Sequence, residues 1–213
     1  DDRALKITSE LAAAEALQDE QDRHFWDEQR GDWYVSDGAD PTVIVRRIGG
    51  RELRALDFNF NGWGQKQEHR RDAKIAGFIA HRVGLPLPRS SMVLEGGGIE
   101  VDGEGTAIVK ESYVLNRNRN PGLTNTAAEK VLSADLGLTK IIWLPGPAGG
   151  DITDAHTDFY ARFAGAGRVV VSHDANDTYG EQAVTQRHIE VLKKATDAKG
   201  RALSLTIIPV PDQ

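Results

Sequence analysis

The segment Asp151-Ile-Thr-Asp-Ala-His-Thr-Asp158 holds the densest cluster of ionisable side chains, with three carboxylates and one imidazole in eight residues. Side chains alternate along a strand, so an extended backbone would point Asp154, His156 and Asp158 to one face. A carboxylate binds a guanidinium through paired hydrogen bonds, and a histidine between carboxylates can act as a general acid and then a base. The open alternatives are a solvated acidic loop and a divalent-cation site, which Asp and His also suit.

A glycine-rich segment supplies a further carboxylate candidate. Glu95 opens Glu95-Gly-Gly-Gly-Ile99 at the end of an apolar run, where a carboxylate can face a pocket. The glycines allow the backbone to pass close to a ligand. The segment is not a phosphate loop, because no Gly-Lys-Ser/Thr follows. The alternative interpretation is a glycine-rich hairpin with acidic side chains on its surface.

Two other polar segments have a possible binding role. Trp63 lies between Gly62 and Gly64, and an exposed tryptophan on such a loop can stack on a planar cation. A tryptophan that anchors the loop on the core is the alternative. The run Asn116-Arg-Asn-Arg-Asn-Pro121 is polar enough to contact an anion, although it also suits a structural turn.

Three successive rounds of strand, strand, helix and strand account for the elements that would carry these segments, each round about 55 residues long. A helix over 8–28 precedes them. The predicted rounds are strands at Thr42–Arg46 and Leu53–Phe58 with a helix at His69–Val83; strands at Ile99–Val101, Thr106–Lys110 and Lys140–Leu144 with a helix at 125–136; and strands at Thr157–Phe163, Val169–Val171 and Leu203–Val210 with a helix at 180–198. Such units do not bury both faces alone, and repetition around an axis solves this.

Composition bounds the class of protein. Hydrophobic residues make up 39% of the 213 positions, which supports a packed α/β core. A net charge of −6 argues against a nucleic-acid partner, and no apolar run reaches the length needed to cross a membrane. The chain has no cysteine, which excludes disulfides, thiolate metal sites and a cysteine nucleophile within it and is compatible with a cytoplasmic location.

Five segments in order give these patterns a specific meaning. They are Phe60-Asn-Gly-Trp-Gly-Gln-Lys66, Leu94-Glu-Gly-Gly-Gly-Ile-Glu-Val-Asp-Gly-Glu-Gly-Thr106, Asn118-Arg-Asn-Pro121, Ile142-Trp-Leu-Pro145 and Asp151–Asp158. Over residues 40–211 the chain resembles the agmatine deiminase and bacterial peptidylarginine deiminase family. Its members are penteins, in which five ββαβ units surround a pseudo-fivefold axis with the active site in the central channel. The resemblance implies one partial pentein-type α/β propeller over 1–213, with a helical segment at 1–30 and about three of five units at 31–213.

The resemblance also implies a reaction, the hydrolysis of a guanidinium such as that of agmatine to a ureido group and ammonia. In the family a cysteine thiolate attacks the guanidinium carbon, and a histidine protonates the departing ammonia before activating water. By motif, His156 matches the general acid and base, and Glu95 matches the carboxylate that orients the histidine or the substrate. Asp158 matches a guanidinium-binding carboxylate, and Trp63 is a further substrate-binding candidate. No metal or organic cofactor is expected.

The sequence departs from the family at three places. The family nucleophile lies in a Gly-Gly-Gly-Ile-His-Cys type segment near the C-terminus, which this chain lacks. The family's guanidinium-binding Arg-Asp-x-Gly-Pro motif reads Ser36-Asp37-Gly-Ala-Asp-Pro41 here, so Asp37 lies one residue too far from the proline. Ala155 replaces a glycine beside the histidine.

These departures lead to expectations about what completes the protein. A second chain or further segments would complete the fold and supply the cysteine, and exposed edge strands and apolar faces are expected without them. A homodimer is the oligomer that the resemblance suggests. The alternatives to a deiminase are an inactive module that binds a guanidino ligand or a partner and, third, a metal-binding protein built on 151–158.

Overall fold

The computed structural model describes residues 55–82, 84–146 and 151–210, together with the backbone of strands β1 (Trp26–Asp27), β2 (Asp32–Trp33), β3 (Val43–Ile48) and the start of β4 (Glu52–Asp57). The chain divides into two compact units, Asp1–Ala39 and Asp40–Gln213. Within the first unit, β1 and β2 form an antiparallel pair. The helix predicted over 8–28 is wrong at residues 26 and 27, which form β1, and otherwise lies outside the described residues.

The second unit begins with the predicted hairpin. Strands β3 and β4 pair antiparallel within two residues of the predicted limits. The helix predicted from His69 starts later, as the 3₁₀ turn η1 (Asp72–Lys74) and helix α3 (Ile75–Arg82). In place of a closing strand, carbonyls of Pro86 and Pro88 accept hydrogen bonds of 3.1 Å from β4. The N–H of Ser90 returns a hydrogen bond of 2.8 Å to the Asp57 carbonyl, so a single parallel bridge forms between Asp57 and Arg89, but prolines have no N–H and the pairing does not extend into a strand.

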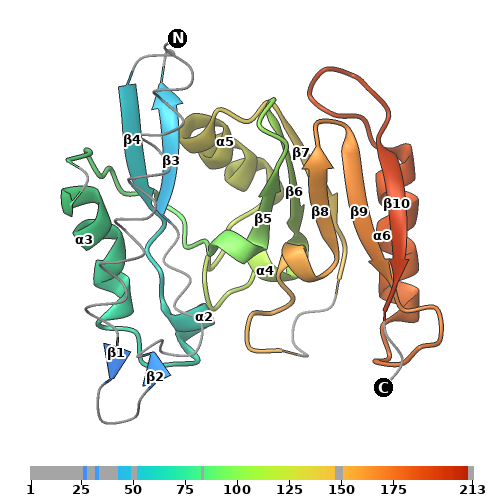
Figure 1. Cartoon of the computed structure of the whole chain (residues 1–213), viewed down its shortest axis with the longest axis horizontal. Coiled ribbons are helices and arrows are strands. Elements are labelled where there is room, and N and C mark those ends of the chain that lie inside the picture. The colour runs from blue at the N-terminus through green and yellow to red at the C-terminus, as the bar shows by residue number, and fades with distance from the viewer. Residues whose placement is uncertain are drawn as a thin grey trace. The chain divides into compact units, whose positions relative to one another are not determined.

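Two three-stranded sheets follow with the same topology (Figure 1). The first contains β5 (Ile99–Val101), β6 (Thr106–Lys110) and β7 (Lys140–Leu144), and the second contains β8 (Ala161–Gly165), β9 (Arg168–His173) and β10 (Ser204–Pro209). In each sheet the first two strands are antiparallel and the last is parallel, joined through helix α5 (Asn125–Leu136) or α6 (Gln182–Lys194). The predicted order of strand, strand, helix and strand is therefore present in both rounds.

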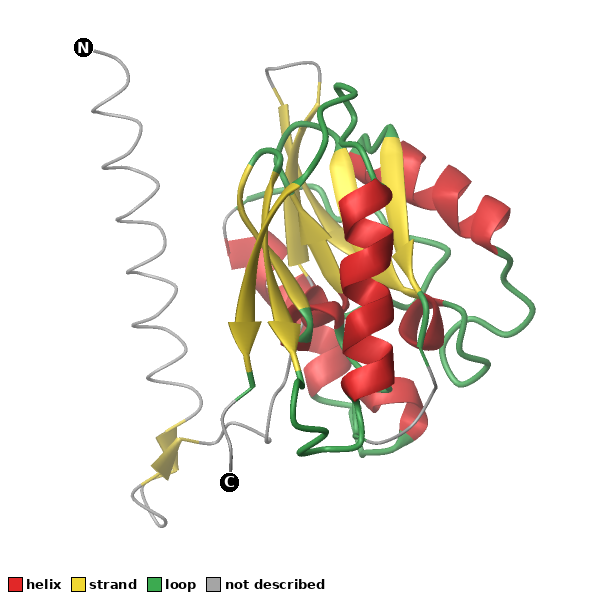
Figure 2. Ribbon diagram, turned by 90° about the vertical axis from the view of Figure 1, so that its right-hand side faces the viewer, coloured by secondary structure: helices red, strands yellow, loops and turns green. Residues whose placement is uncertain are grey.

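Capping explains why the limits of α5 match the sequence prediction. The hydroxyl of Thr124 accepts a hydrogen bond from the backbone N–H of Ala127 at the start of the helix. Gly137 follows its last residue with a left-handed backbone, φ 70°, which glycine adopts without a steric penalty. Helix α6 lies alongside β9 and β10. Figure 2 shows the side of the molecule that carries this helix and these strands.

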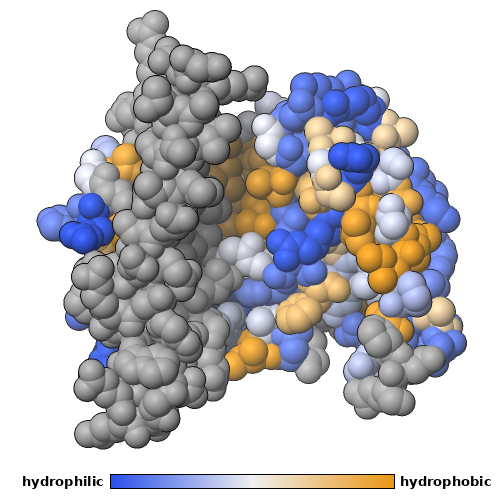
Figure 3. Space-filling view, in the orientation of Figure 1, coloured by the Kyte–Doolittle hydropathy of each residue, from blue (hydrophilic) through white to orange (hydrophobic). Residues whose placement is uncertain are grey.

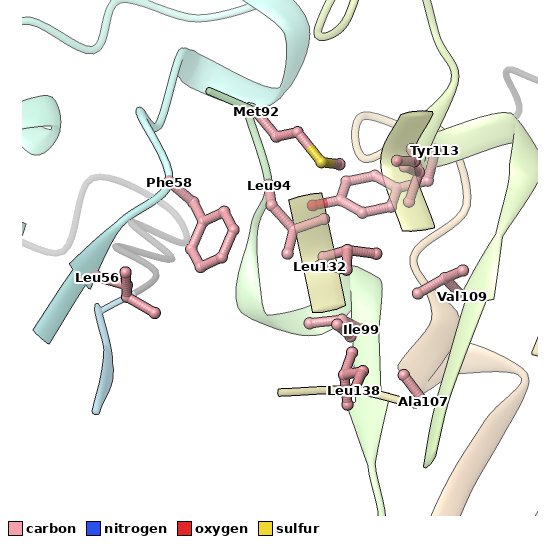
Figure 4. Packing of buried hydrophobic residues seen from close by; sticks show 12 residues of the cluster. Leu56, Phe58, Met92, Leu94, Ile99, Ala107, Val109, Tyr113, Leu132 and Leu138 are labelled. Carbon is pink, nitrogen blue, oxygen red and sulfur yellow. The ribbon is translucent and has the colours of Figure 1, made fainter. Parts of the chain in front are cut away.

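Two apolar clusters lie on either side of strand β6, all five of whose residues are buried. Ala107 and Val109 belong to a cluster built around Leu94, Tyr113 and Leu132 (Figure 4). The intervening Ile108 belongs to a second cluster with residues from β7, β9 and α6. Because strand side chains alternate, one short strand contributes to both cores and fixes the segments that follow its two ends.

Apolar side chains also lie on the surface over β9 and β10 (Figure 3). Strand β10 is at the edge of its sheet in the described part, and its Ile207 and Ile208 are about half exposed. This agrees with the expectation of an exposed edge strand. Within the described residues, no helix combines the length and apolar character needed to cross a membrane.

Candidate active site

The loop that carries the acidic cluster is not extended, and this corrects the geometry expected from alternation. Asp154 and Ala155 both have left-handed backbones, with φ 61° and 68°, and Thr157–Phe159 form the 3₁₀ turn η3. The Asp151 carboxylate accepts the backbone N–H of Ala155 at 3.1 Å, which closes the loop. Because the chain reverses at Asp154, its side chain points to partners other than those of His156. Ala155 adopts a conformation that favours glycine, so this substitution strains the backbone.

His156 and Glu95 are in direct contact inside the Asp40–Gln213 unit. The imidazole Nε2 lies 3.1 Å from Oε2 of Glu95, and both side chains are buried. A carboxylate only accepts hydrogen bonds, so this contact assigns the imidazole hydrogen to Nε2. The Nδ1 atom then lies on the opposite edge of the ring, toward Gly97. The structure therefore brings the two predicted catalytic side chains together, while their catalytic roles stay predictions.

Arg119 is a cation of this cluster and pairs with two of its carboxylates. Its Nε lies 2.9 Å from both Oε1 and Oε2 of Glu95, and its Nη1 lies 2.6 Å from Oδ2 of Asp154. Burial alone would lower the pKa of Arg119, but the charge and hydrogen bonds of Glu95 and the bond to Asp154 raise that pKa above its ordinary value. The guanidinium is therefore a permanent charge between two carboxylates.

Asp154 is held by cations rather than left open to a ligand. Besides Arg119, Lys66 Nζ lies 2.8 Å from Oδ1 and the Asn118 amide donates to Oδ2 at 2.9 Å. Burial raises the pKa of Asp154, but the hydrogen bonds from Asn118, Lys66 and Arg119 outweigh it and hold the pKa below its ordinary value. This carboxylate thus serves the architecture of the loop.

Asp158 lies beside His156 over Gly97. A Cβ atom built on Gly97 would lie 2.6 Å from Nδ1 of His156 and 2.9 Å from Oδ2 of Asp158, so only glycine leaves room for both. The other oxygen of Asp158, Oδ1, is buried and has no hydrogen-bond partner in the described part of the chain. A buried carboxylate oxygen without a donor is costly, and its role in binding a substrate stays a prediction.

Tyr113 forms the floor of this cluster. Its ring meets the His156 ring edge to face with centres 4.9 Å apart, and the Arg119 guanidinium carbon lies 4.9 Å from the centre of the ring. The Tyr113 hydroxyl exchanges hydrogen bonds with the backbone of Glu95. A Cβ on Gly98 would overlap the ring at 1.9 Å. Gly98 therefore leaves room for the Tyr113 ring, and Gly97 leaves room for His156 and Asp158.

Trp63 and Asp37 are the other two predicted binding residues. Trp63 is 4% exposed and packs edge to face on Phe60, so the expectation of an exposed stacking platform is wrong. The left-handed backbone at Trp63, φ 53°, turns the indole inward. Its contribution to substrate binding stays a prediction. Asp37 lies outside the described residues, and its role likewise stays a prediction.

Sequence reasoning did not foresee Arg119 or Lys66 as members of the cluster. The Asn-Arg-Asn-Pro run did carry a signal, since it was polar enough to contact an anion, but the anion proves to be the protein's own carboxylates. Among the described residues, no three His, Asp or Glu side chains are grouped to hold a metal ion. The metal-site interpretation of 151–158 therefore has no geometric support there.

The chain is similar to curated agmatine deiminases along most of its length. The agmatine deiminase of Stutzerimonas stutzeri is 40% identical over 209 residues, which cover 94% of this chain and 55% of the relative. The agmatine deiminase of Pseudomonas fluorescens is 37% identical over 177 residues, covering 80% and 48%. The chain thus spans about half the length of these relatives.

Solved structures give the same result for the fold. The agmatine deiminase of Enterococcus faecalis matches with a TM-score of 0.72 at 31% identity, over 76% of this chain and 46% of that one. A cysteine-to-serine variant of the C. jejuni agmatine deiminase with substrate bound matches with a TM-score of 0.72 at 32% identity, over 82% and 51%. The family model of the Porphyromonas-type peptidyl-arginine deiminase matches residues 6–213. The chain therefore belongs to the Porphyromonas-type peptidyl-arginine deiminase family.

Proposed function

We propose that this chain supplies the guanidinium-binding and proton-transfer groups of a guanidine deiminase, which converts agmatine or a related guanidino compound to its ureido product and ammonia. The observation that carries the proposal is the buried, unpaired Oδ1 of Asp158 beside the imidazole of His156. A guanidinium is planar, permanently charged and has only N–H donors, so it would give this oxygen the hydrogen bond and the positive charge that it lacks.

The contact between His156 and Glu95 suits the proton transfers of such a reaction. With Nε2–H bonded to Glu95, the ring exchanges its second proton at Nδ1, on the side of Asp158. A thiolate that attacks the guanidinium carbon forms a C–S bond, and the imidazolium Nδ1–H then protonates one amino nitrogen, so that the C–N bond breaks and ammonia leaves. Neutral Nδ1 next accepts a proton from water, whose oxygen adds to the same carbon and displaces the thiolate. Glu95 stabilises the imidazolium state between these steps.

The nucleophile of this reaction is proposed to lie outside these 213 residues. The chain contains no cysteine, so it is expected to be inactive by itself. The C. jejuni relative was captured with its substrate as a cysteine-to-serine variant, which supports a thiol as the nucleophile. We place the thiol on another segment of the same protein or on a second chain that completes a five-unit ring, of which this chain contributes about three units. A cytoplasmic location and a homodimer belong to the same proposal.

Ammonia release from agmatine, measured with the gene product that carries these 213 residues, tests the proposal. Asp158→Asn removes the charge at nearly constant shape and is expected to raise KM for agmatine by about 100-fold, because a charged hydrogen bond is lost. His156→Gln is expected to lower kcat by about 100-fold or more without a comparable change in KM. Asp177→Asn and His81→Gln, at exposed positions, are the matched controls.

The results also separate the deiminase from the alternative of an inactive binding module. The absence of cysteine from this chain is the observation that favours the alternative. Calorimetry that detects agmatine binding, lost in Asp158→Asn, without release of ammonia would establish a binding module. Neither binding nor turnover with any guanidino compound would overturn both functions.

A further inference from the structure

We propose that Arg119 is a positioning residue that clamps Glu95 and His156 to the loop carrying the histidine and thereby sets the rate of proton transfer. The inference rests on the proposed function and extends it to a residue that contacts neither substrate nor reacting atoms. The inference is supported by the number and direction of the hydrogen bonds that the buried Arg119 guanidinium donates.

The Arg119 side chain is fully buried and donates in three directions. Its Nε bonds both oxygens of Glu95, Nη1 bonds Asp154 and, at 3.1 Å, the side-chain oxygen of Asn118, and Nη2 donates to the Thr153 carbonyl at 3.0 Å. These acceptors come from the glycine-rich segment, the Asn-Arg-Asn turn and the histidine loop. A single planar group therefore ties together the three segments that form the site.

These contacts close a ring through the catalytic pair. Arg119 holds Glu95, Glu95 holds Nε2 of His156, and the backbone N–H of His156 donates to the Thr153 hydroxyl at 3.0 Å. The Thr153 carbonyl returns to Arg119. Since every link is a hydrogen bond between buried or half-buried groups, the imidazole cannot rotate without breaking at least one of them. The clamp thus fixes which nitrogen faces Asp158.

The turn that carries Arg119 is itself anchored on both sides. The Asn120 amide donates 2.9 Å hydrogen bonds to the carbonyls of Val93 and Val114. Lys66 supplies the second cation on Asp154 and also donates to the Asp151 and Ile152 carbonyls. Two cations and two carboxylates then balance in charge around the clamp. The Asn118-Arg-Asn-Pro121 segment is therefore both a structural turn and an anion-binding group.

A lysine cannot replace this arginine in the clamp. Its ammonium is a single point with three donors, whereas the guanidinium presents a fixed planar fork. Arg119→Lys keeps the positive charge that the buried carboxylates require but loses the fork. Arg117→Lys is the matched control, because Arg117 is exposed two residues earlier in the same motif. Comparing the two variants separates positioning from a general effect of exchanging arginine for lysine.

A milder variant guards against loss of folding in Arg119→Lys. Asp154→Asn keeps the shape of the side chain, and asparagine tolerates the left-handed backbone at this position. It removes one charged acceptor of Arg119 while leaving Glu95 in place. Asp177→Asn is its control, since Asp177 is exposed and also left-handed, with φ 54°.

The experiment measures kcat and KM for agmatine and the far-downfield ¹H NMR signal of the carboxylate-bound imidazole N–H, using the gene product that carries these residues. Arg119→Lys is expected to lower kcat by about 100-fold with KM changed by less than about threefold, because Asp158 is outside the clamp. Asp154→Asn is expected to lower kcat by about tenfold. Both should lose or shift the downfield signal, and both controls should keep it.

Unchanged kcat and an unchanged downfield signal in a folded Arg119→Lys would overturn the inference. If that variant does not fold, the same result in Asp154→Asn overturns it. The double variant is expected to be no slower than Arg119→Lys alone, because both changes open one clamp, and a product of the two losses would contradict this. If the unaltered protein releases no ammonia, the proposed function fails, while the NMR comparison still decides whether Arg119 holds His156.

Discussion

Two buried cations, Arg119 and Lys110, lie over tyrosine rings but have opposite surroundings. The Arg119 guanidinium carbon is 4.9 Å from the centre of the Tyr113 ring, and Lys110 Nζ is 3.5 Å from that of Tyr160. Arg119 meets two carboxylates, whereas Lys110 Nζ has no hydrogen-bond partner among the described residues. Cation–π contact and burial are therefore common to both, and only the counter-charges differ.

The difference appears in the pKa of each group. Burial acts to lower the pKa of both cations, but Glu95 and Asp154 more than offset it at Arg119. At Lys110 burial is opposed only weakly by Glu181 and Asp151, and the pKa falls from 10.5 to about 8. A buried charge with partners thus fixes the geometry of a site, whereas one without partners mainly carries a cost in stability.

Removing the counter-charge of Arg119 gives the largest expected effect on stability. Glu95→Ala is expected to lower the free energy of unfolding by about 3–5 kcal/mol, because it leaves a buried guanidinium with an unpaired side. Urea denaturation measures this loss. Glu104→Ala, which breaks half-exposed pairs with Lys199 and Arg201, is the control and should cost less than about 1 kcal/mol. Equal losses in the two variants would contradict the contrast.

Removing Lys110 is expected to act in the opposite direction. Its pKa is about 8 when folded and 10.5 when unfolded, so the unfolded chain binds more protons between those values and stability rises with pH across that window. Below about pH 8 the buried charge costs up to about 3 kcal/mol. Lys110→Met should therefore be more stable than the unaltered protein at pH 7 and equal to it above pH 10.5. Urea denaturation at both pH values measures the difference, and equal stability at pH 7 would contradict it.

Two glycines, one near each of the buried cations, allow a third test in which matched substitutions are compared. Alanine at Gly97 would press on His156 and Asp158, of which His156 is held in place by Glu95. Alanine at Gly146 would lie 2.8 Å from Cε of Lys110, the flexible end of an unpaired side chain. Gly97→Ala is expected to lower kcat by about 100-fold and stability by about 1–3 kcal/mol, and Gly146→Ala to change stability by less than about 0.5 kcal/mol. Ammonia release and thermal unfolding measure both, and an active Gly97→Ala would remove the crowding argument.

Local signals in the sequence were sufficient for much of the fold. The limits of strands Thr106–Lys110 and Lys140–Leu144 and of the helix over 125–136 match the prediction. Each is bounded by a cap or a glycine, which acts within a few residues. The predicted strand Thr157–Phe163 fails at its first half because Thr157–Phe159 form a 3₁₀ turn after the left-handed residues Asp154 and Ala155, and an alanine gives no sign of such a backbone.

The site was predictable only where a motif named its residues. The pairing of Glu95 with His156 spans 61 positions, and that of Arg119 with Asp154 spans 35, so no local spacing reveals either. Motif resemblance supplied His156, Glu95 and Asp158. It included Arg119 in the matched segment Asn118-Arg-Asn-Pro121 but gave it no role in the site, because the sequence does not show that its anionic partners are the protein's own carboxylates. The exposure of a side chain is equally hard to predict from sequence. Trp63 is buried because of the residues that surround it in the fold, which no local pattern reveals.

Removing the Tyr160 hydroxyl is expected to have a small effect and tests what supports Lys110. The hydroxyl donates to Glu181 at 2.8 Å, and burial together with Glu181 raises the pKa of Tyr160. Tyr160→Phe keeps the ring under Lys110 and loses only this bond, so about 1 kcal/mol of stability should be lost in urea denaturation at pH 7. The stabilisation gained from Lys110→Met should persist in the double variant, because the missing partner of the ammonium is a charge rather than this hydroxyl. If Lys110→Met no longer stabilised the protein in the Tyr160→Phe background, the hydroxyl and Glu181 would be acting on Lys110 as Glu95 and Asp154 act on Arg119. The two cations would then differ only in how strongly their partners stabilise them.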